Sequence, residues 1–135
     1  MKTERIAEIA NDYKKALKRL EEAINENPRE SKVIIDGTIQ RFEFTFELAW
    51  KLVKAVLNYY GTEANSPRSA IKEGYKMELI KNGERWIDML EDRNLTSHIY
   101  DEKDSLRIYK KVKKRHFKDL KALEEAVSKL LKEIK

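Results

Sequence analysis

The sequence predicts an all-α protein, an antiparallel up-and-down bundle of four to five helices. Its 135 residues include only four glycines and two prolines, and they are rich in Ala, Leu, Glu, Lys and Arg, which favour helices. Apolar residues recur every three to four positions along most of the chain. Long amphipathic helices with short connections pack as an antiparallel bundle. Because no linker interrupts the pattern, residues 1–135 are expected to form one domain.

The first two helices are expected over about residues 3–25 and 31–60. The first carries one apolar stripe from Ile6 to Ile24. The second has a heptad-like seam formed by Ile35, Ile39, Phe42, Phe46, Ala49, Val53, Val56 and Tyr60. Five further apolar residues lie outside this seam: Phe44, Leu48, Trp50, Leu52 and Leu57. This helix should therefore be central or shared with a second chain, and Gly61 is placed to cap its end.

Three helices are expected in the second half of the chain. Ser66 and Pro67 form an N-cap and first helical residue, and they predict a short helix up to residues 82–83. Another helix follows from about Glu84, and a last long helix begins at about Glu102. The last helix is expected to turn these residues inward: Leu106, Tyr109, Phe117, Leu120, Leu123, Val127, Leu130 and Ile134.

Three other aromatic residues are interpreted as structural. His116 lies on the inward stripe of the last helix, one turn before Leu120, so we expect a packed histidine and not a catalyst. Trp50 and Trp86 are expected to pack in the core or in an interface, in preference to a role in stacking on nucleic-acid bases.

Several classes of protein are disfavoured by composition. No run of about 18 apolar residues is present and no secretion signal follows Met1, so a soluble cytoplasmic protein without membrane contact is expected. Absence of cysteine excludes disulfides and thiol catalysis. The two histidines are far apart in sequence, without metal-ligand spacing, so no metal site is expected. No cofactor is predicted either.

Reactive side chains gather in residues 86–102, around a predicted helix end. Asp101 is suited to cap the next helix, which places Arg93 and His98 near the boundary. On an uninterrupted helix these two residues would lie about 140° apart, too far to reach one small ligand. Unwinding after Ser97 would bring them together, as would a two-fold dimer that sets two Arg-His pairs across a shared cleft.

Two long segments carry a resemblance to a known family. The first is DGTIQRFEFTFELAWK at residues 36–51, and the second is RNLTSHIYDE at residues 93–102, with the pattern Arg-x4-His-x-Tyr. The chain resembles the nucleotidyltransferase substrate-binding proteins, a branch of the HEPN superfamily (higher eukaryotes and prokaryotes nucleotide-binding) related to the HepT toxins. Matches in the same order include Ser66-Pro67-Arg68, Trp86 and Met89-Leu90, and the likeness covers roughly residues 1–130.

The resemblance implies a helical bundle, usually a homodimer, that partners a separate minimal nucleotidyltransferase. In HepT toxins the Arg and His serve a metal-independent ribonuclease, and the antitoxin partner attaches AMP to the Tyr. Those roles would fall to Arg93, His98 and Tyr100. The family name itself proposes substrate binding, so a noncatalytic substrate- or nucleotide-binding subunit is the alternative, and a purely structural interaction module is a third hypothesis.

The chemistry of such a site suits these residue types. RNA cleavage without metal needs a base for the 2'-hydroxyl, an acid for the leaving oxygen and a cation for the developing charge. Histidine exchanges protons near neutrality, and arginine grips phosphate oxygens. Asn94 would add a hydrogen bond, and Asp101 would orient His98. In the competing interpretation, Arg93 pairs with Glu91 or Asp92, His98 simply ends a helix, and Tyr100 packs at the end of the bundle.

Two charged features complete the prediction. Asp36, Gln40, Glu43 and Glu47 share one helix face, and they are expected to form a salt-bridged scaffold with Arg41, Lys51 or Arg93 in preference to binding Mg²⁺. Residues 102–135 carry twelve Lys and Arg against six Asp and Glu. Within them, a candidate patch for RNA phosphates or an acidic partner consists of Lys110, Lys111, Lys113, Lys114 and Arg115; the alternative is a solvated helix face.

Overall fold

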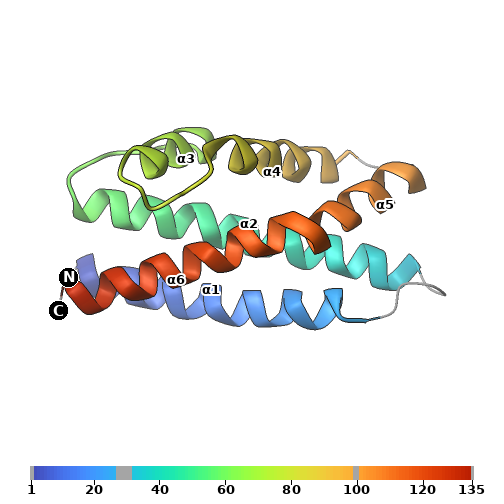
Figure 1. Ribbon diagram of the computed structural model, residues 1–135, viewed down its shortest axis with the longest axis horizontal. Helices are drawn as coiled ribbons and strands as arrows, with labels where there is room; N and C mark the ends of the chain where they lie inside the picture. Colours follow the sequence, from blue (N-terminus) through green and yellow to red (C-terminus); the bar gives the residue numbers. More distant parts are fainter. Residues whose placement is uncertain (1, 27–31, 99–100, 135) are drawn as a thin grey trace.

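The computed structural model describes residues 2–26, 32–98 and 101–134, and these residues form helices and connecting turns (Figure 1). The elements are α1 (Lys2–Ile24), α2 (Lys32–Tyr59), α3 (Pro67–Lys76), α4 (Gly83–Thr96), α5 (Glu102–Lys111), the π-helical turn η2 (Val112–His116) and α6 (Phe117–Glu133). The predicted all-α bundle is confirmed. Within the described ranges, no helix is both long enough and apolar enough to cross a membrane.

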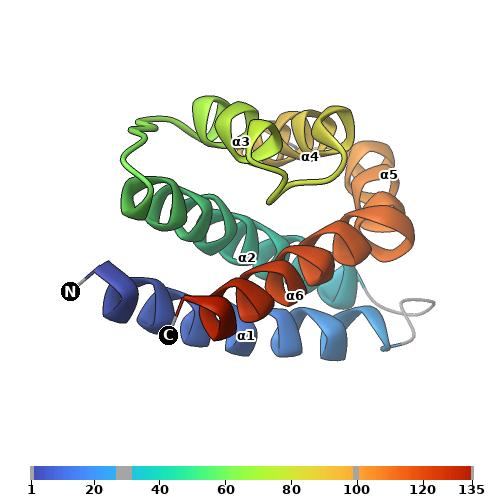
Figure 2. The same ribbon diagram turned by 60° about the vertical axis from the view of Figure 1, so that its left-hand side comes forward.

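Helix α2 is the centre of the bundle, as its sequence predicted. It contacts α1, α3, α4, α5 and α6, with α1 on one side and α3 and α4 on the other (Figure 2). Phe42 and Phe46 on α2 are completely buried. Gly61 ends the helix with a positive φ of 87°, as expected for a C-cap glycine. Tyr60 is 49% exposed and not part of the seam, because it lies in the turn beyond the helix.

Helix α3 begins as predicted but ends earlier. Ser66 caps it, and its side chain accepts a hydrogen bond from the Ser69 backbone N–H. The helix ends at Lys76 and not at residues 82–83, because Glu78 takes a positive φ of 65° and the chain folds back. The backbone N–H groups of Leu79 and Ile80 then both donate to the carbonyl of Gly74. This turn, rather than a longer helix, buries Leu79 and Ile80.

The predicted last helix is continuous but contains the π-helical turn η2. Its buried residues Ile108, Val112, His116 and Leu120 are spaced by four each time. That makes twelve residues over three turns, whereas three regular α-helical turns contain about 11. A π-helical turn absorbs the extra residue and keeps all four side chains facing inward.

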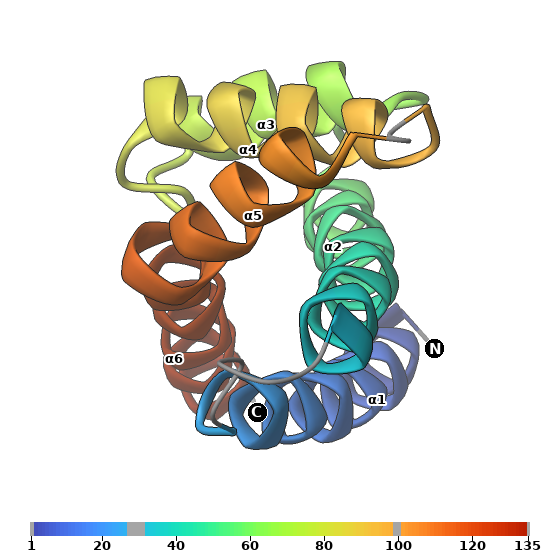
Figure 3. The ribbon, with the colours of Figure 1, turned by 90° about the vertical axis from the view of Figure 1, so that its right-hand side faces the viewer.

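The inward stripe of this helix is confirmed for Tyr109, Leu120, Leu123 and Val127, which are buried. Phe117, Leu130 and Ile134 are only partly buried. Leu106 was predicted to face inward and is 39% exposed, because α5 crosses the end of the bundle (Figure 3) and Leu106 lies on its flank beside Ile35 of α2.

Candidate functional site

The candidate site lies at the C-terminal end of α4. This helix begins at the Asn82 cap, whose side chain accepts from the Arg85 N–H, and it turns Trp86, Met89 and Leu90 into the core. It ends at Thr96, and the backbone N–H of His98 donates to the Leu95 carbonyl at 2.8 Å in the turn that follows. The helix therefore ends between Arg93 and His98, in the segment where the sequence predicted a helix boundary.

Arg93 is tied to the polar face of α2. Its guanidinium lies 3.5 Å from Oε2 of Glu43 and 3.5 Å from Oε1 of Glu47, and its side chain is 24% exposed. The Thr96 hydroxyl, one turn later, donates to the same Glu43 oxygen at 2.6 Å. Arg93 is thus an observed partner among those predicted for the α2 stripe, which consists of Asp36, Gln40, Glu43 and Glu47. The two segments of the family resemblance meet at this contact.

The remaining stripe residues line a small hollow beside this contact. Asp36, Gln40 and Glu43 surround a space of about 170 Å³ together with Thr96, Ser105 and one apolar residue, Ile39. Arg41, another predicted partner, instead donates to the Arg19 carbonyl of α1 at 2.6 Å. The hollow is therefore mostly polar and adjoins the last turn of α4.

The other predicted site residues lie beyond this contact. His98 and Asn94 are exposed. Asp101 caps α5, since its Oδ1 accepts from the Lys103 N–H at 2.9 Å, as the sequence predicted. The proposed role of Asp101 in orienting His98 stays a prediction. Tyr100 lies outside the described residues.

A buried ionic network beside Arg93 was not predicted. Asp92 is 3% exposed, and its Oδ2 lies 2.7 Å from His116 Nε2 and 2.8 Å from Lys111 Nζ. The His116 ring is completely buried and stacks on Phe42 at a centroid distance of 5.5 Å, so the predicted packing of His116 is confirmed. The competing interpretation in which Arg93 pairs with Asp92 is wrong, because Asp92 faces η2.

The network also corrects the predicted basic patch. Lys111 Nζ lies 2.9 Å from Asp88 Oδ2, and Arg115 also pairs with Asp88. Both cations therefore turn toward α4 and are neutralised there. The sequence held a signal for this contact, because the pairs 88/92 and 111/115 are both spaced by four and carry opposite charge. Three members of the patch are exposed: Lys110, Lys113 and Lys114.

Protonation in this network follows from its hydrogen bonds. Burial alone would raise the pKa of Asp92, but the hydrogen bonds from His116 and Lys111 outweigh it and hold the pKa below the ordinary value of 3.8. Burial would lower the pKa of Lys111, but its bonds to Asp92 and Asp88 raise it above the ordinary value. Both groups are therefore charged at neutral pH.

The same cluster contains potential metal ligands. Within the described part of the chain, ligand atoms of Asp88, Asp92 and His116 lie within 4.8 Å of one another. The Lys111 ammonium contacts both carboxylates and supplies the positive charge that a metal ion would bring. We therefore interpret the cluster as an ion-pair network that joins α4 to α5 and η2.

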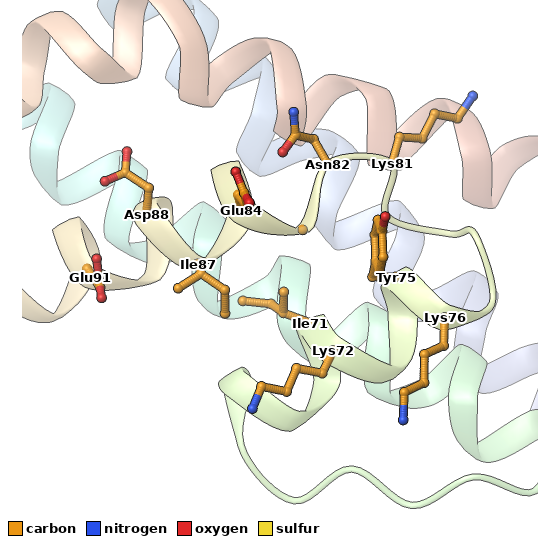
Figure 4. Close-up of a pocket in the computed structure, with 11 residues that line it drawn as sticks. Ile71, Lys72, Tyr75, Lys76, Lys81, Asn82, Glu84, Ile87, Asp88 and Glu91 are labelled. Carbon is orange, nitrogen blue, oxygen red and sulfur yellow. The ribbon is translucent and has the colours of Figure 1, made fainter.

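A larger hollow lies elsewhere, between α3 and α4 (Figure 4), with a volume of about 870 Å³. Ile71 and Ile87 approach each other from the two helices, and Tyr75 stands at one end. Lys72 and Lys76 lie on the α3 side, and Lys81 lies in the turn before α4. Carboxylates line the α4 side: Glu84, Asp88 and Glu91. Arg93 and His98 do not line this groove.

Comparisons with known proteins find a family, a named relative and a similar solved structure. A family model described as "Nucleotidyltransferase substrate binding protein like" matches residues 9–129. A protein named "Probable ribonuclease HepT" from Haemophilus influenzae is 31% identical over 84 residues, which cover 58% of this chain and 58% of that protein. A crystal structure from Thermus thermophilus is 34% identical, with a TM-score of 0.73, and the match covers 88% of this chain and 98% of that chain.

Proposed function

The chain belongs to the nucleotidyltransferase substrate-binding protein family, and from this premise we propose that it is a toxin-like, metal-independent ribonuclease that partners a separate minimal nucleotidyltransferase acting as its antitoxin. The observation that carries the proposal is the end of α4, where Arg93 lies on the last turns of the helix and His98 is exposed just beyond it. The relative named as a probable ribonuclease supports the same activity.

The proposed reaction uses the 2'-hydroxyl of RNA as the nucleophile. His98 takes the hydroxyl proton, the 2'-oxygen attacks the adjacent phosphorus, and the bond to the 5'-oxygen breaks. The products are a 2',3'-cyclic phosphate and a 5'-hydroxyl, which receives a proton from an acid. Arg93 stabilises the extra negative charge of the phosphorane, and its contacts to Glu43 and Glu47 fix its position on α4.

A homodimer would supply the second proton-transfer group. The exposed surface at this end includes Leu95, which is 44% exposed and lies between Arg93 and His98, and Leu106 on the flank of α5. A second copy that covers Leu95 would bring two Arg-His pairs close together, so that one His98 acts as base and the other as acid. Burial of exposed leucines would favour this association.

The test is cleavage of single-stranded RNA by the wild type and by the Arg93→Ala, His98→Ala double variant. We expect the wild type to cleave RNA in the presence of EDTA with 2',3'-cyclic phosphate ends, and the double variant to be slower by about 100-fold or more. Arg5→Ala, an exposed arginine on α1, is the control and should cleave like the wild type. Equal cleavage by the double variant would remove the nuclease proposal.

A second candidate function is noncatalytic binding of a substrate or nucleotide for the partner enzyme. The groove between α3 and α4 favours it, because an apolar floor with Tyr75 at one end and charged residues around it can hold an aromatic polar molecule. Co-expression with a minimal nucleotidyltransferase as the proposed partner separates the two functions. Mass spectrometry should find AMP on Tyr100 if the partner silences a toxin, whereas calorimetry should show nucleotide binding that Tyr75→Ala weakens if the groove binds substrate.

A further inference from the structure

The outward face of α5 and η2 carries a row of basic side chains. Lys103, Arg107, Lys110 and Lys114 are spaced by four, three and four, so they share one face of the helix. All four are exposed, whereas Ile108 and Val112 on the opposite face are completely buried. We call these four residues the outer row.

The outer row has little role in holding the fold together. Lys103, Lys110 and Lys114 form no ion pair within the described ranges, and Arg107 makes only long contacts to Asp92 at 3.7 Å and Asp104 at 3.9 Å. The neighbouring carboxylates of α4 are already neutralised by Lys111 and Arg115. Like charges one helical turn apart disfavour a helix by about 0.2–0.5 kcal/mol per pair. Apart from the long contacts of Arg107, the outer row therefore gains no ion-pair stabilisation within the described ranges, and its like charges cost a little.

The outer row begins at the end of the molecule that carries the candidate site. Helix α5 starts beside the C-terminal end of α4 and crosses the end of the bundle toward α6 (Figure 3). Its first basic residue, Lys103, therefore lies at the same end as His98. The twelve residues from Lys103 to Lys114 are separated by eleven helical steps and extend about 17 Å along the helix, which is enough to follow several consecutive phosphates.

We propose that the outer row binds the phosphate backbone of a single RNA strand and leads it to Arg93 and His98, so that the substrate is a polynucleotide and not a mononucleotide. This proposal rests on the proposed ribonuclease function. Charged side chains dominate this face, with Leu106 exposed beside them, whereas the centre of a protein-protein interface is depleted of charged residues and enriched in aromatic ones. Interfaces with nucleic acid are polar and strongly basic, which favours RNA over an acidic protein.

The affinity should depend on salt in a predictable way. Each phosphate that a lysine neutralises on a single strand changes the slope of log K against log salt by about −0.7. The three unpaired lysines of the outer row should therefore contribute about −2 to the slope. Between 50 and 200 mM salt, this contribution corresponds to roughly a 16-fold loss of affinity.

The experiment measures fluorescence anisotropy of a labelled single-stranded RNA, in the Arg93→Ala, His98→Ala background so that no cleavage occurs. The test variant adds Lys103→Gln, Lys110→Gln and Lys114→Gln. The control adds Lys14→Gln, Lys15→Gln and Lys18→Gln, three exposed lysines of α1. Glutamine keeps helix propensity close to that of lysine, and thermal melting checks that both variants fold.

We expect the test variant to bind RNA at least tenfold more weakly at low salt, with a slope of log K against log salt that is less negative by about 2. The affinity of the control variant should change less than twofold. Equal effects of the two sets, or no effect of the outer row, would overturn the proposal. Equal competition by polyglutamate of matched charge would also overturn it, because it would show a site for acidic chains in general. If RNA binds as expected but the wild type does not cleave it, the outer row stands and the nuclease proposal fails.

Discussion

Replacement of Asp92 by alanine is expected to lower the free energy of unfolding by about 3 kcal/mol. The carboxylate is 3% exposed and accepts hydrogen bonds from His116 and Lys111. Its removal leaves the imidazole of His116, which has no exposure to solvent, without a partner for Nε2, and leaves a cavity between α4 and η2. Chemical denaturation at pH 7 measures the loss.

Asp88→Ala is the matched control, because Asp88 contacts the same Lys111 one turn earlier on α4. Its side chain is 35% exposed, so solvent screens its ion pairs and the expected loss is about 1 kcal/mol or less. Equal losses for the two variants would contradict the conclusion that burial gives Asp92 its special role.

The loss of stability at acid pH gives a second measurement of the role of the Asp92 carboxylate. Its folded pKa is lowered below the ordinary value of 3.8. A lowered pKa contributes stability that is fully present above the unfolded pKa and is lost as pH falls through the folded pKa. Between about pH 4 and pH 2, the wild type should therefore lose more stability per pH unit than Asp92→Asn, which has no proton to gain at this position. Equal losses per pH unit in the two proteins would show that Asp92 is not held ionised.

Phe42→Ala is expected to destabilise the protein by about 3–5 kcal/mol. Phe42 is completely buried, it stacks on His116 and it lies 6.4 Å from the Phe46 ring between centroids. Truncation removes apolar contacts at the centre of the bundle and leaves the imidazole without its stacking partner. The loss is measured by denaturant titration, with the slope compared to check that unfolding stays two-state.

Phe44→Ala, two residues along the same helix, is the control for Phe42→Ala. Phe44 is 62% exposed, so the same substitution should change stability within about 0.5 kcal/mol. A large loss at Phe44 would mean that the protein buries this surface, for example in a dimer, and the loss would then depend on protein concentration.

The sequence predicted most of the helices because the signals for them are local. Apolar spacing located α1 and α2, the Ser66-Pro67 pair located the start of α3, and the side chain of Asp101 located the start of α5. The contact of Arg93 with the α2 stripe was also among the predictions, because the carboxylates of that stripe share one helix face and need positive partners.

The features that were missed depend on contacts distant in sequence. The early end of α3 requires Glu78 to take a left-handed conformation. Such a conformation is usually predicted from a glycine, and this position is not a glycine. The exposure of Leu106 follows from the direction in which α5 crosses the bundle. The ion pairs of Lys111 and Arg115 with carboxylates of α4 were also missed, because the matching spacing by four does not by itself show that these two segments, far apart in the sequence, lie side by side.

The π-helical turn changes the direction in which side chains point between the first and second halves of the last helix. Upstream of Val112, side chains are placed to pack on α2 and to display Lys103, Arg107 and Lys110 of the outer row, while downstream of His116 they are placed to pack on α1. Without the additional residue, one half of this helix would be rotated by about 100° relative to its neighbours. The wider turn therefore lets one continuous helix pack in two directions. Substitutions in the buried residues of α6 and in the basic residues of α5 can then occur independently of each other.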